Sequence, residues 1–217
     1  MPYIITVSSL LFTFQLIRVT LQNNPHRFTY KVIACIHFLL LGMTAALFVP
    51  IAKGEVGLLY GLFFSFVGDI FLGLRSKRKI YFICGLFFFI LAQCAYLSVF
   101  TFSSFNVLVF AITMFIQSIV IAALIRYRGL DLPVNIVPFV LLYDFILISV
   151  FTLAFGSYFQ EPSLIHFLRL SGALFFLLSD SILFTVYFIR PKSKVQILLY
   201  MAFYYLAQLL YAFTLWL

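Results

Sequence analysis

Charged side chains are scarce in this chain, where aspartate, glutamate, lysine and arginine together make up only 9% of the 217 residues. Hydrophobic residues make up 65%, and the mean hydropathy is +1.17. A water-soluble domain of this length could not cover its exterior with so few polar side chains. The shortage of charge therefore excludes a soluble globular protein and predicts a polytopic membrane protein.

Cysteine is also rare, and its placement excludes the chemistry that depends on it. Cys35, Cys84 and Cys94 lie inside apolar runs, without a CxxC motif or a cysteine–histidine cluster. Cys84 and Cys94 would stand roughly 15 Å apart along one helix, which is too far for a disulfide. We interpret the three cysteines as small packing residues, and we expect no metal and no cofactor.

Two further signals are missing from the sequence. The basic residues give a net charge of +8 but do not form one stripe, so nucleic acid is not an expected partner. There is also no GxSxG motif and no recognisable Ser-His-Asp or Cys-His set. These absences disfavour an ordinary acyl hydrolase.

Long apolar runs are abundant. Crossing the hydrocarbon layer takes about 20 residues of helix. The chain divides into eight such runs: residues 2–17, 31–51, 56–74, 80–101, 105–125, 133–156, 164–189 and 195–216. The runs do not alternate between apolar and polar residues, which excludes barrel strands. The sequence thus predicts an all-α protein with eight transmembrane helices in one integral membrane domain, residues 1–217.

The basic residues lie mainly in the gaps that follow the first, third, fifth and seventh runs. These gaps hold twelve of the fourteen lysines and arginines: Arg18, Arg27, Lys31, Arg75, Lys77, Arg78, Lys79, Arg126, Arg128, Arg190, Lys192 and Lys194. Basic loops stay in the cytoplasm, so both termini are expected on the opposite side. Residues 1–17 lack the features of a cleavable signal, so we expect a retained span. The membrane would be the bacterial inner membrane, or the endoplasmic reticulum in a eukaryote.

Two segments of the sequence resemble each other. Residues 61–72 (GLFFSFVGDIFL) align without gaps with residues 172–183 (GALFFLLSDSIL), and the next helix in each case carries a Leu-Ala-Gln-x-x-Tyr motif. The shared positions are Gly61/Gly172, Phe64/Phe175, Asp69/Asp180 and Leu72/Leu183. Because the copies lie four helices apart, on the third and seventh runs, both cross the membrane in the same direction. We therefore predict two parallel four-helix repeats, residues 1–101 and 105–217, related by a pseudo-two-fold axis.

Asp69 and Asp180 are the most informative residues, because a charge inside the membrane costs on the order of 3 kcal/mol. The repeat would place both at similar depth, facing one central cavity. Two carboxylates in a partly dry cavity suit acid–base chemistry, since one can be protonated while the other stays ionised. Alternatively, both are helix-packing groups that bind serine or tyrosine. Asp144, which lies outside the repeat, could have either role.

Other polar residues also allow two interpretations. Gln93 and Gln208 could bind substrate or could join helices by hydrogen bonds. Lys31 and the basic segment 75–79 could be topology signals, or could hold a lipid phosphate at the cytoplasmic surface.

The segments GLFFSFVGDIFL, GLFFFILAQCAY, SGALFFLLSDSIL and YYLAQLLY resemble the YhhN family of lysoplasmalogenases, which are eight-helix membrane proteins. The resemblance runs from Lys31 to the last helix. It implies hydrolysis of the vinyl ether bond of a lysophospholipid, the lysoplasmalogen, within the bilayer. The products would be a fatty aldehyde and glycerophosphocholine or glycerophosphoethanolamine.

The resemblance implies that Asp69 and Asp180 are the catalytic residues. The residues that we expect to bind the substrate are Lys31, Ser65, Gln93, Ser179, Tyr204 and Gln208. The chain departs from the family pattern at two positions, with Gln93 in place of a histidine and Val32 in place of a proline. A glutamine can donate and accept hydrogen bonds but cannot carry a proton through the reaction.

Two other classes of protein share some of these sequence features. A proton-coupled transporter or flippase for small lipids would also use repeats and buried acids, and it would bind lipid without releasing a product. An intramembrane aspartyl protease also pairs aspartates. Here, however, the Tyr-Asp at 143–144 follows the Gly-Asp at 68–69, which is the reverse order, and the Gly-x-Gly-Asp motif is missing.

The topology gives the first testable prediction. A reporter enzyme that works only outside the cytoplasm should be active when it is fused after Leu217, because the basic gaps fix both termini on that side. The matched control is a reporter that works only in the cytoplasm, fused at the same residue. Activity of the cytoplasmic reporter at this position would contradict the predicted orientation.

Overall fold

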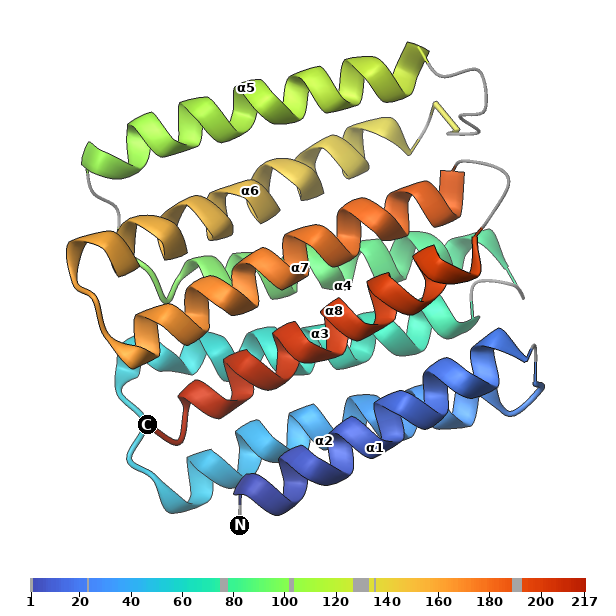
Figure 1. Cartoon of the computed structure of the whole chain (residues 1–217), viewed down its shortest axis with the longest axis horizontal. Helices are drawn as coiled ribbons and strands as arrows, with labels where there is room; N and C mark the ends of the chain where they lie inside the picture. Colours follow the sequence, from blue (N-terminus) through green and yellow to red (C-terminus); the bar gives the residue numbers. More distant parts are fainter. Residues whose placement is uncertain are drawn as a thin grey trace.

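The computed structural model describes residues 2–22, 24–74, 78–101, 104–126, 133–134, 136–188 and 193–217, and within them it contains eight α-helices (Figure 1). The helices are α1 (Pro2–Leu21), α2 (Arg27–Phe48), α3 (Val56–Leu74), α4 (Lys79–Leu97), α5 (Ser104–Arg126), α6 (Val137–Gln160), α7 (Leu164–Phe188) and α8 (Lys194–Thr214). A short 3-10 helix, η1 (Lys53–Glu55), precedes α3. The helices run alternately up and down, so the two termini lie at the same end of the bundle (Figure 1).

The predicted apolar runs correspond to the observed helices, and the all-α prediction is confirmed. Seven helices of the described chain are long and apolar enough to cross a membrane. In α5, the apolar stretch that the structure describes, Val107–Val120, is shorter. The helices differ from the predicted runs mainly at their ends: α1 extends to Leu21, and α2 begins one turn before Lys31. The chain is therefore a multi-pass membrane protein.

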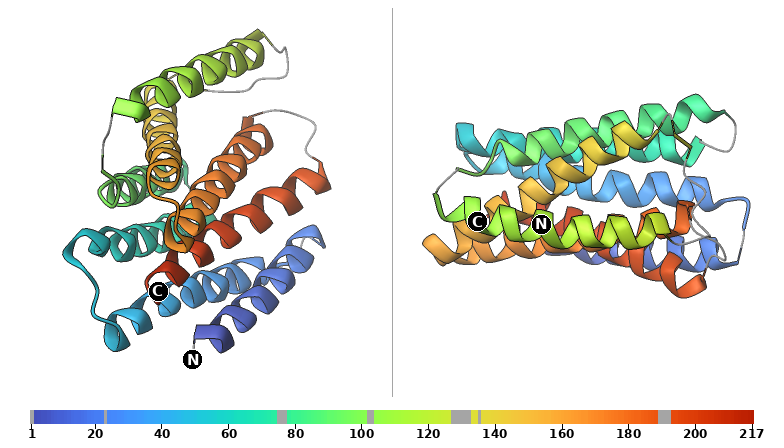
Figure 2. Two further views of the ribbon diagram at one scale, coloured as in Figure 1. Left: turned by 60° about the vertical axis from the view of Figure 1, so that its left-hand side comes forward. Right: turned by 90° about the horizontal axis from the view of Figure 1, so that it is seen from above.

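Six of the helices pack in a ring. The order around the ring is α2, α3, α4, α6, α7 and α8, and α8 packs against α2 to close it. Outside the ring, α1 packs against α2 and α8, and α5 packs against α6 (Figure 2). The most extensive contacts join α3 to α4 and α7 to α8. The ring arrangement leaves its interior available for polar side chains.

The outer faces of the helices are apolar. Large hydrophobic side chains with more than half of their surface exposed include Leu11, Phe14, Leu47, Phe115 and Ile116. A soluble bundle would turn such side chains inward. Their exposure matches helix faces that contact lipid tails, where an apolar surface costs nothing.

Two glycines allow close packing in the interior of the bundle. Gly61 lies against the ring of Tyr96, and Gly172 lies against the ring of Tyr211. The two tyrosine rings stack on each other with their centroids 4.4 Å apart, and both are fully buried. A Cβ atom at Gly172 would lie 3.2 Å from the Tyr211 ring, and one at Gly61 would overlap the Tyr96 ring.

Arg169, whose role the sequence does not indicate, lies at the end of the bundle that carries the termini. It belongs to α7 and is 6% exposed, and its Nη2 atom is 2.6 Å from Oε1 of Glu55 in η1. This ion pair ties the start of α3 to α7 across the ring. It also explains how an arginine is accommodated within an apolar helix.

Several residues on which the topology argument rests lie outside the described part of the chain. They are Arg75, Lys77, Arg128, Arg190 and Lys192. The orientation in the membrane therefore stays a prediction.

The tyrosine stack gives the second testable prediction. Gly61→Ala should lower the melting temperature of the purified protein by several degrees, because the new Cβ must displace a buried, stacked ring at a cost of about 1–3 kcal/mol. Gly54→Ala is the control, since a Cβ at Gly54 would meet no atom within 4 Å. Equal melting temperatures for Gly61→Ala and the unaltered protein would contradict this account of the packing.

Candidate functional site

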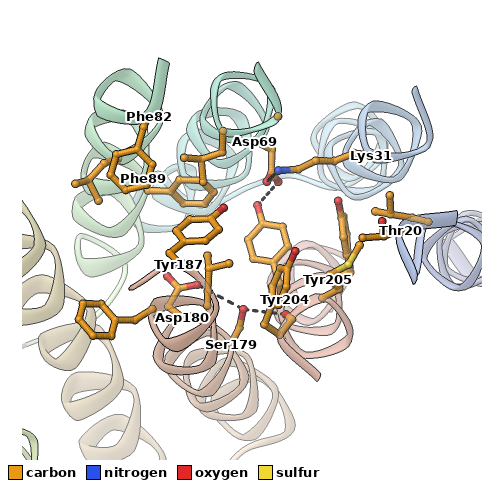
Figure 3. A pocket seen from close by; sticks show the side chains of 18 of the residues that line it. Thr20, Lys31, Asp69, Phe82, Phe89, Ser179, Asp180, Tyr187, Tyr204 and Tyr205 are labelled. Atoms are coloured by element: carbon orange, nitrogen blue, oxygen red, sulfur yellow. Dashed lines mark hydrogen bonds and ion pairs between the residues drawn. The ribbon is translucent and has the colours of Figure 1, made fainter. Parts of the chain in front are cut away.

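A cavity of about 210 Å³ lies at the end of the bundle where α2 and α8 begin. All helices except α5 contribute to its lining in the described part of the chain. Both Asp69, from α3, and Asp180, from α7, line it (Figure 3). The two copies of the repeated aspartate thus share one cavity, although 111 positions separate them in the sequence.

The carboxylate of Asp69 has three interaction partners. Its Oδ1 atom is 2.8 Å from the Nζ atom of Lys31, which forms an ion pair with it. Its Oδ2 atom accepts a hydrogen bond of 2.5 Å from the hydroxyl of Tyr204 and one of 3.2 Å from the thiol of Cys35. The side chain of Asp69 is nearly buried, so these partners replace the water that an exposed carboxylate would bind.

Asp180 has different partners. Its Oδ2 atom accepts a short hydrogen bond from the hydroxyl of Tyr143 on α6. The hydroxyl of Ser179 lies 3.4 Å from the Oδ1 atom and donates at 3.0 Å to the carbonyl of Tyr200 (Figure 3). Within the described residues, no lysine or arginine forms an ion pair with Asp180. The two aspartates therefore differ: one is paired with a cation and the other with neutral hydroxyl groups.

A small residue precedes each aspartate, and the packing explains why. Gly68 lies against Phe89, whose ring lines the cavity, and a Cβ at Gly68 would be 2.8 Å from that ring. Ser179 is fully buried, and its hydroxyl binds the backbone of α8. Larger side chains at these two positions would push the neighbouring helices away from the aspartates.

The position of Lys31 also depends on a glycine. Gly73, one turn after Asp69 on α3, faces α2, and a Cβ there would lie 2.7 Å from the ring of Phe28. The absence of a side chain at Gly73 lets Phe28 and Lys31 approach α3 closely. Because α2 begins at Arg27 rather than at Lys31, the lysine lies within the helix and faces α3 instead of ending at the surface.

Of the predicted site residues, Lys31, Asp69, Ser179, Asp180 and Tyr204 all line the cavity. The structure thus brings the larger part of the predicted set together.

Three predicted site residues do not line this cavity. Ser65, Gln93 and Gln208 are fully buried in the helix packing. The Oε1 atom of Gln208 accepts a hydrogen bond of 2.6 Å from the hydroxyl of Tyr96, which joins α8 to α4. Gln93 lies near Tyr143, but its amide makes no hydrogen bond of ordinary geometry with the described residues. A substrate-binding role for these three residues stays a prediction.

Cys35 takes a part in the site that its apolar sequence context does not show. Cys35 is buried in the hydrophobic core, as a packing residue would be, but its thiol also donates to Asp69 and lies 3.4 Å from the hydroxyl of Tyr205. Its position one turn after Lys31, on the same face of the helix, was the available signal.

Tyr143 and Asp144 have separate roles in the structure. Tyr143 binds Asp180, which the sequence did not indicate. Asp144 does not line the cavity, and its Oδ1 atom accepts a hydrogen bond of 2.8 Å from the amide of Gln117 on α5. Asp144 therefore links α5 to α6 and stands apart from the site.

Comparison with known proteins gives one match. The sequence pattern of the YhhN family matches residues 27–215, which is most of the chain. No curated protein and no solved structure matches it. The chain belongs to the YhhN family. The match begins at α2, so Leu16 and Thr20 of α1, which line the cavity, lie outside the matched region.

The ion pair gives the third testable prediction. Lys31→Met should destabilise the protein by on the order of 3 kcal/mol, because it leaves the Asp69 carboxylate buried without a countercharge. Adding Asp69→Asn to Lys31→Met should recover a large part of this loss, since the uncompensated charge is then gone. The measurement is a double-mutant cycle by unfolding in detergent, with Lys53→Gln, an exposed lysine at the other end, as the control. Additive effects of the two substitutions on the free energy of unfolding would show that the ion pair does not stabilise the fold.

Proposed function

We propose that this member of the YhhN family is a hydrolase of the lysoplasmalogenase type. It cleaves the vinyl ether bond of a lysoplasmalogen with one water molecule. The products are a fatty aldehyde and glycerophosphocholine or glycerophosphoethanolamine. The observation that carries the proposal is the shared cavity, in which Asp69 has a cationic partner and Asp180 has neutral ones.

Asp180 is assigned as the general acid. Hydrolysis of a vinyl ether starts with proton transfer to the double-bond carbon that is remote from the oxygen, and this step yields an oxocarbenium ion. The proton donor must carry its proton in the resting enzyme. Asp180 can do so without breaking an ion pair, because Tyr143 and Ser179 are neutral. A proton on Asp69 would instead leave the ammonium group of Lys31 without its partner.

Asp69 is assigned as the stabilising carboxylate. Its negative charge faces the cavity where the positive charge of the oxocarbenium ion develops, and its three donors fix its position before the reaction begins. Water then adds to the cationic carbon, and the ionised Asp180 accepts the proton that the water loses. The bond from the hemiacetal carbon to the glycerol oxygen then breaks: the glycerol oxygen takes a proton from Asp180 and leaves as the alcohol, and the hemiacetal hydroxyl gives up its proton, which returns to Asp180, as it becomes the aldehyde carbonyl.

The rest of the cavity suits a single-chain lipid. Its lining includes the rings of Phe28, Phe82, Phe89 and Phe184, which would cover an alkenyl chain. The hydroxyl of Tyr204, already bound to Asp69, is suitably placed to orient the attacking water. The other end of the lipid carries a phosphate, for which the predicted cytoplasmic orientation would supply basic loops.

The two-repeat arrangement belongs to the same proposal, and three features support it. The helix contacts correspond in pairs, with α2 packed on α8 as α6 is on α4. Gly61 meets Tyr96 as Gly172 meets Tyr211. The second and sixth helices each supply one partner to an aspartate, from Lys31 to Asp69 and from Tyr143 to Asp180.

The decisive experiment is aldehyde release by the purified protein. A lysoplasmalogen should yield fatty aldehyde, while the matched acyl lysolipid should yield no free fatty acid. Tight binding of lysoplasmalogen without any aldehyde would reject the hydrolase and would support a lipid transporter or flippase instead.

The fourth testable prediction concerns the aspartates. Asp69→Asn and Asp180→Asn should each lower turnover at least a hundredfold, because each removes a group that acts in the transition state. The double variant should be little slower than either single one, since the two groups act as a unit. The measurement is kcat for aldehyde release by folded, monodisperse protein.

Asp144→Asn is the matched control, because Asp144 is also an intramembrane aspartate but lies outside the cavity. Its turnover should stay within a few-fold of the unaltered enzyme. Near-normal turnover in Asp69→Asn or Asp180→Asn would remove that residue from the proposed mechanism.

A further inference from the structure

The cavity carries two cationic side chains in the described part of the chain, and they are not equivalent. Arg27 and Lys31 both belong to α2 and both line the cavity, four residues apart on one face of the helix. The ammonium group of Lys31 is 2.8 Å from Asp69 and is therefore already neutralised. Arg27 is exposed and has no ion-pair partner among the described residues. The charge that is available to a ligand is thus the guanidinium group of Arg27.

We infer that Arg27 binds the phosphate of the substrate and makes the cavity selective for phosphate-bearing single-chain ether lipids over uncharged alkenylglycerols. The inference rests on the proposed function and identifies the residue that determines the substrate class. An arginine suits the task, because its planar group can donate two parallel hydrogen bonds to phosphate oxygens and keeps its charge at any physiological pH.

The spacing along α2 fits the dimensions of such a lipid. Four residues of helix rise about 6 Å, so Arg27 stands one turn beyond the level of Lys31 and Asp69. In a 1-alkenyl lysophospholipid, about five covalent bonds separate the vinyl ether oxygen from the phosphorus, which is roughly 6 Å when extended. A vinyl ether at the level of the aspartates therefore places its phosphate at the level of Arg27.

The surroundings of Arg27 favour an anion rather than a cation. It is the first residue of α2, whose N-terminal end carries partial positive charge, and His26 provides no capping hydrogen bond there. The acidic residues of the cavity, Asp69 and Asp180, lie deeper and hold partners of their own. A phosphate near Arg27 thus meets positive charge, while the reacting bond reaches the carboxylates.

The test measures binding and does not depend on turnover. The probes are two saturated ethers that cannot be hydrolysed by this chemistry, a 1-O-alkyl lysophosphatidylcholine and the 1-O-alkylglycerol with the same chain. Full-length protein in nanodiscs should bind the phospholipid at least tenfold more tightly than the alkylglycerol, because one charge-assisted hydrogen-bonded contact provides about that ratio of affinities. In Arg27→Gln this ratio should fall to about one, while the affinity for the alkylglycerol stays unchanged. Arg27→Lys should retain part of the ratio.

Arg18→Gln is the matched control, because Arg18 is an exposed arginine at the same end of the bundle that does not line the cavity. It should keep the full ratio. The inference is overturned if the unaltered protein binds both ethers equally, or if Arg27→Gln weakens both to the same extent. It is also overturned if inorganic phosphate alone displaces the phospholipid at equal concentration, which would indicate a free-anion site. Selective binding without aldehyde release from lysoplasmalogen would reject the proposed hydrolase and leave this assignment intact.

Discussion

The ion pair between Lys31 and Asp69 is the interaction on which the polar interior of this bundle depends. A lone carboxylate in an apolar bundle carries an energetic cost that packing alone cannot offset. Lys31 supplies the opposite charge from the neighbouring helix, and Tyr204 supplies a hydrogen bond from α8. Because these partners come from α2 and α8, satisfying Asp69 also fixes how three helices meet. Stability and site geometry are thus determined by the same contacts.

The asymmetry between the two aspartates follows from their neighbours. Each lies on a similar segment, after a small residue, and faces the same cavity. On α2 the neighbouring partner is a lysine, whereas on α6 it is a tyrosine. In the proposed mechanism, this difference of one neighbour is enough to give the two acids different chemical roles. The difference in partner thus does more for the chemistry than the pairing of the carboxylates.

Much of the fold could be predicted because the bilayer restricts it. A span needs about 20 apolar residues, so run lengths alone located the helices to within a turn. The sequence predicted that Asp69 and Asp180 face one cavity, because a charge inside a membrane is energetically unfavourable and its repetition argues against coincidence. Lys31 was placed at a helix end, because the first turn of α2 is polar enough to resemble a loop. The structure instead starts the helix at Arg27.

The contacts within the site could not be predicted in the same way. Tyr143 lies on α6, which is apolar on nearly all sides, so its sequence has no periodic signal to indicate which face points inward. Cys35 resembled a small packing residue, because a thiol shows its hydrogen bond only when its neighbours are known. Ser65, Gln93 and Gln208 illustrate the opposite case, since they are polar and lie in the repeated segments but are buried in the helix packing outside the cavity lining.

The proposed function also depends on how deep in the bundle the polar groups lie. In the proposed reaction, the bond that breaks joins an apolar chain to a phosphate-bearing glycerol, so the substrate has one end for the bilayer and one for water. The cavity has the same polarity along its length, with Arg27 at the end of the bundle and the two aspartates further in among aromatic rings. A lipid that satisfies both ends can place only a short stretch at the level of the carboxylates. In the proposed reaction that stretch contains the ether bond, so the position of the site along the bundle would select the bond that reacts.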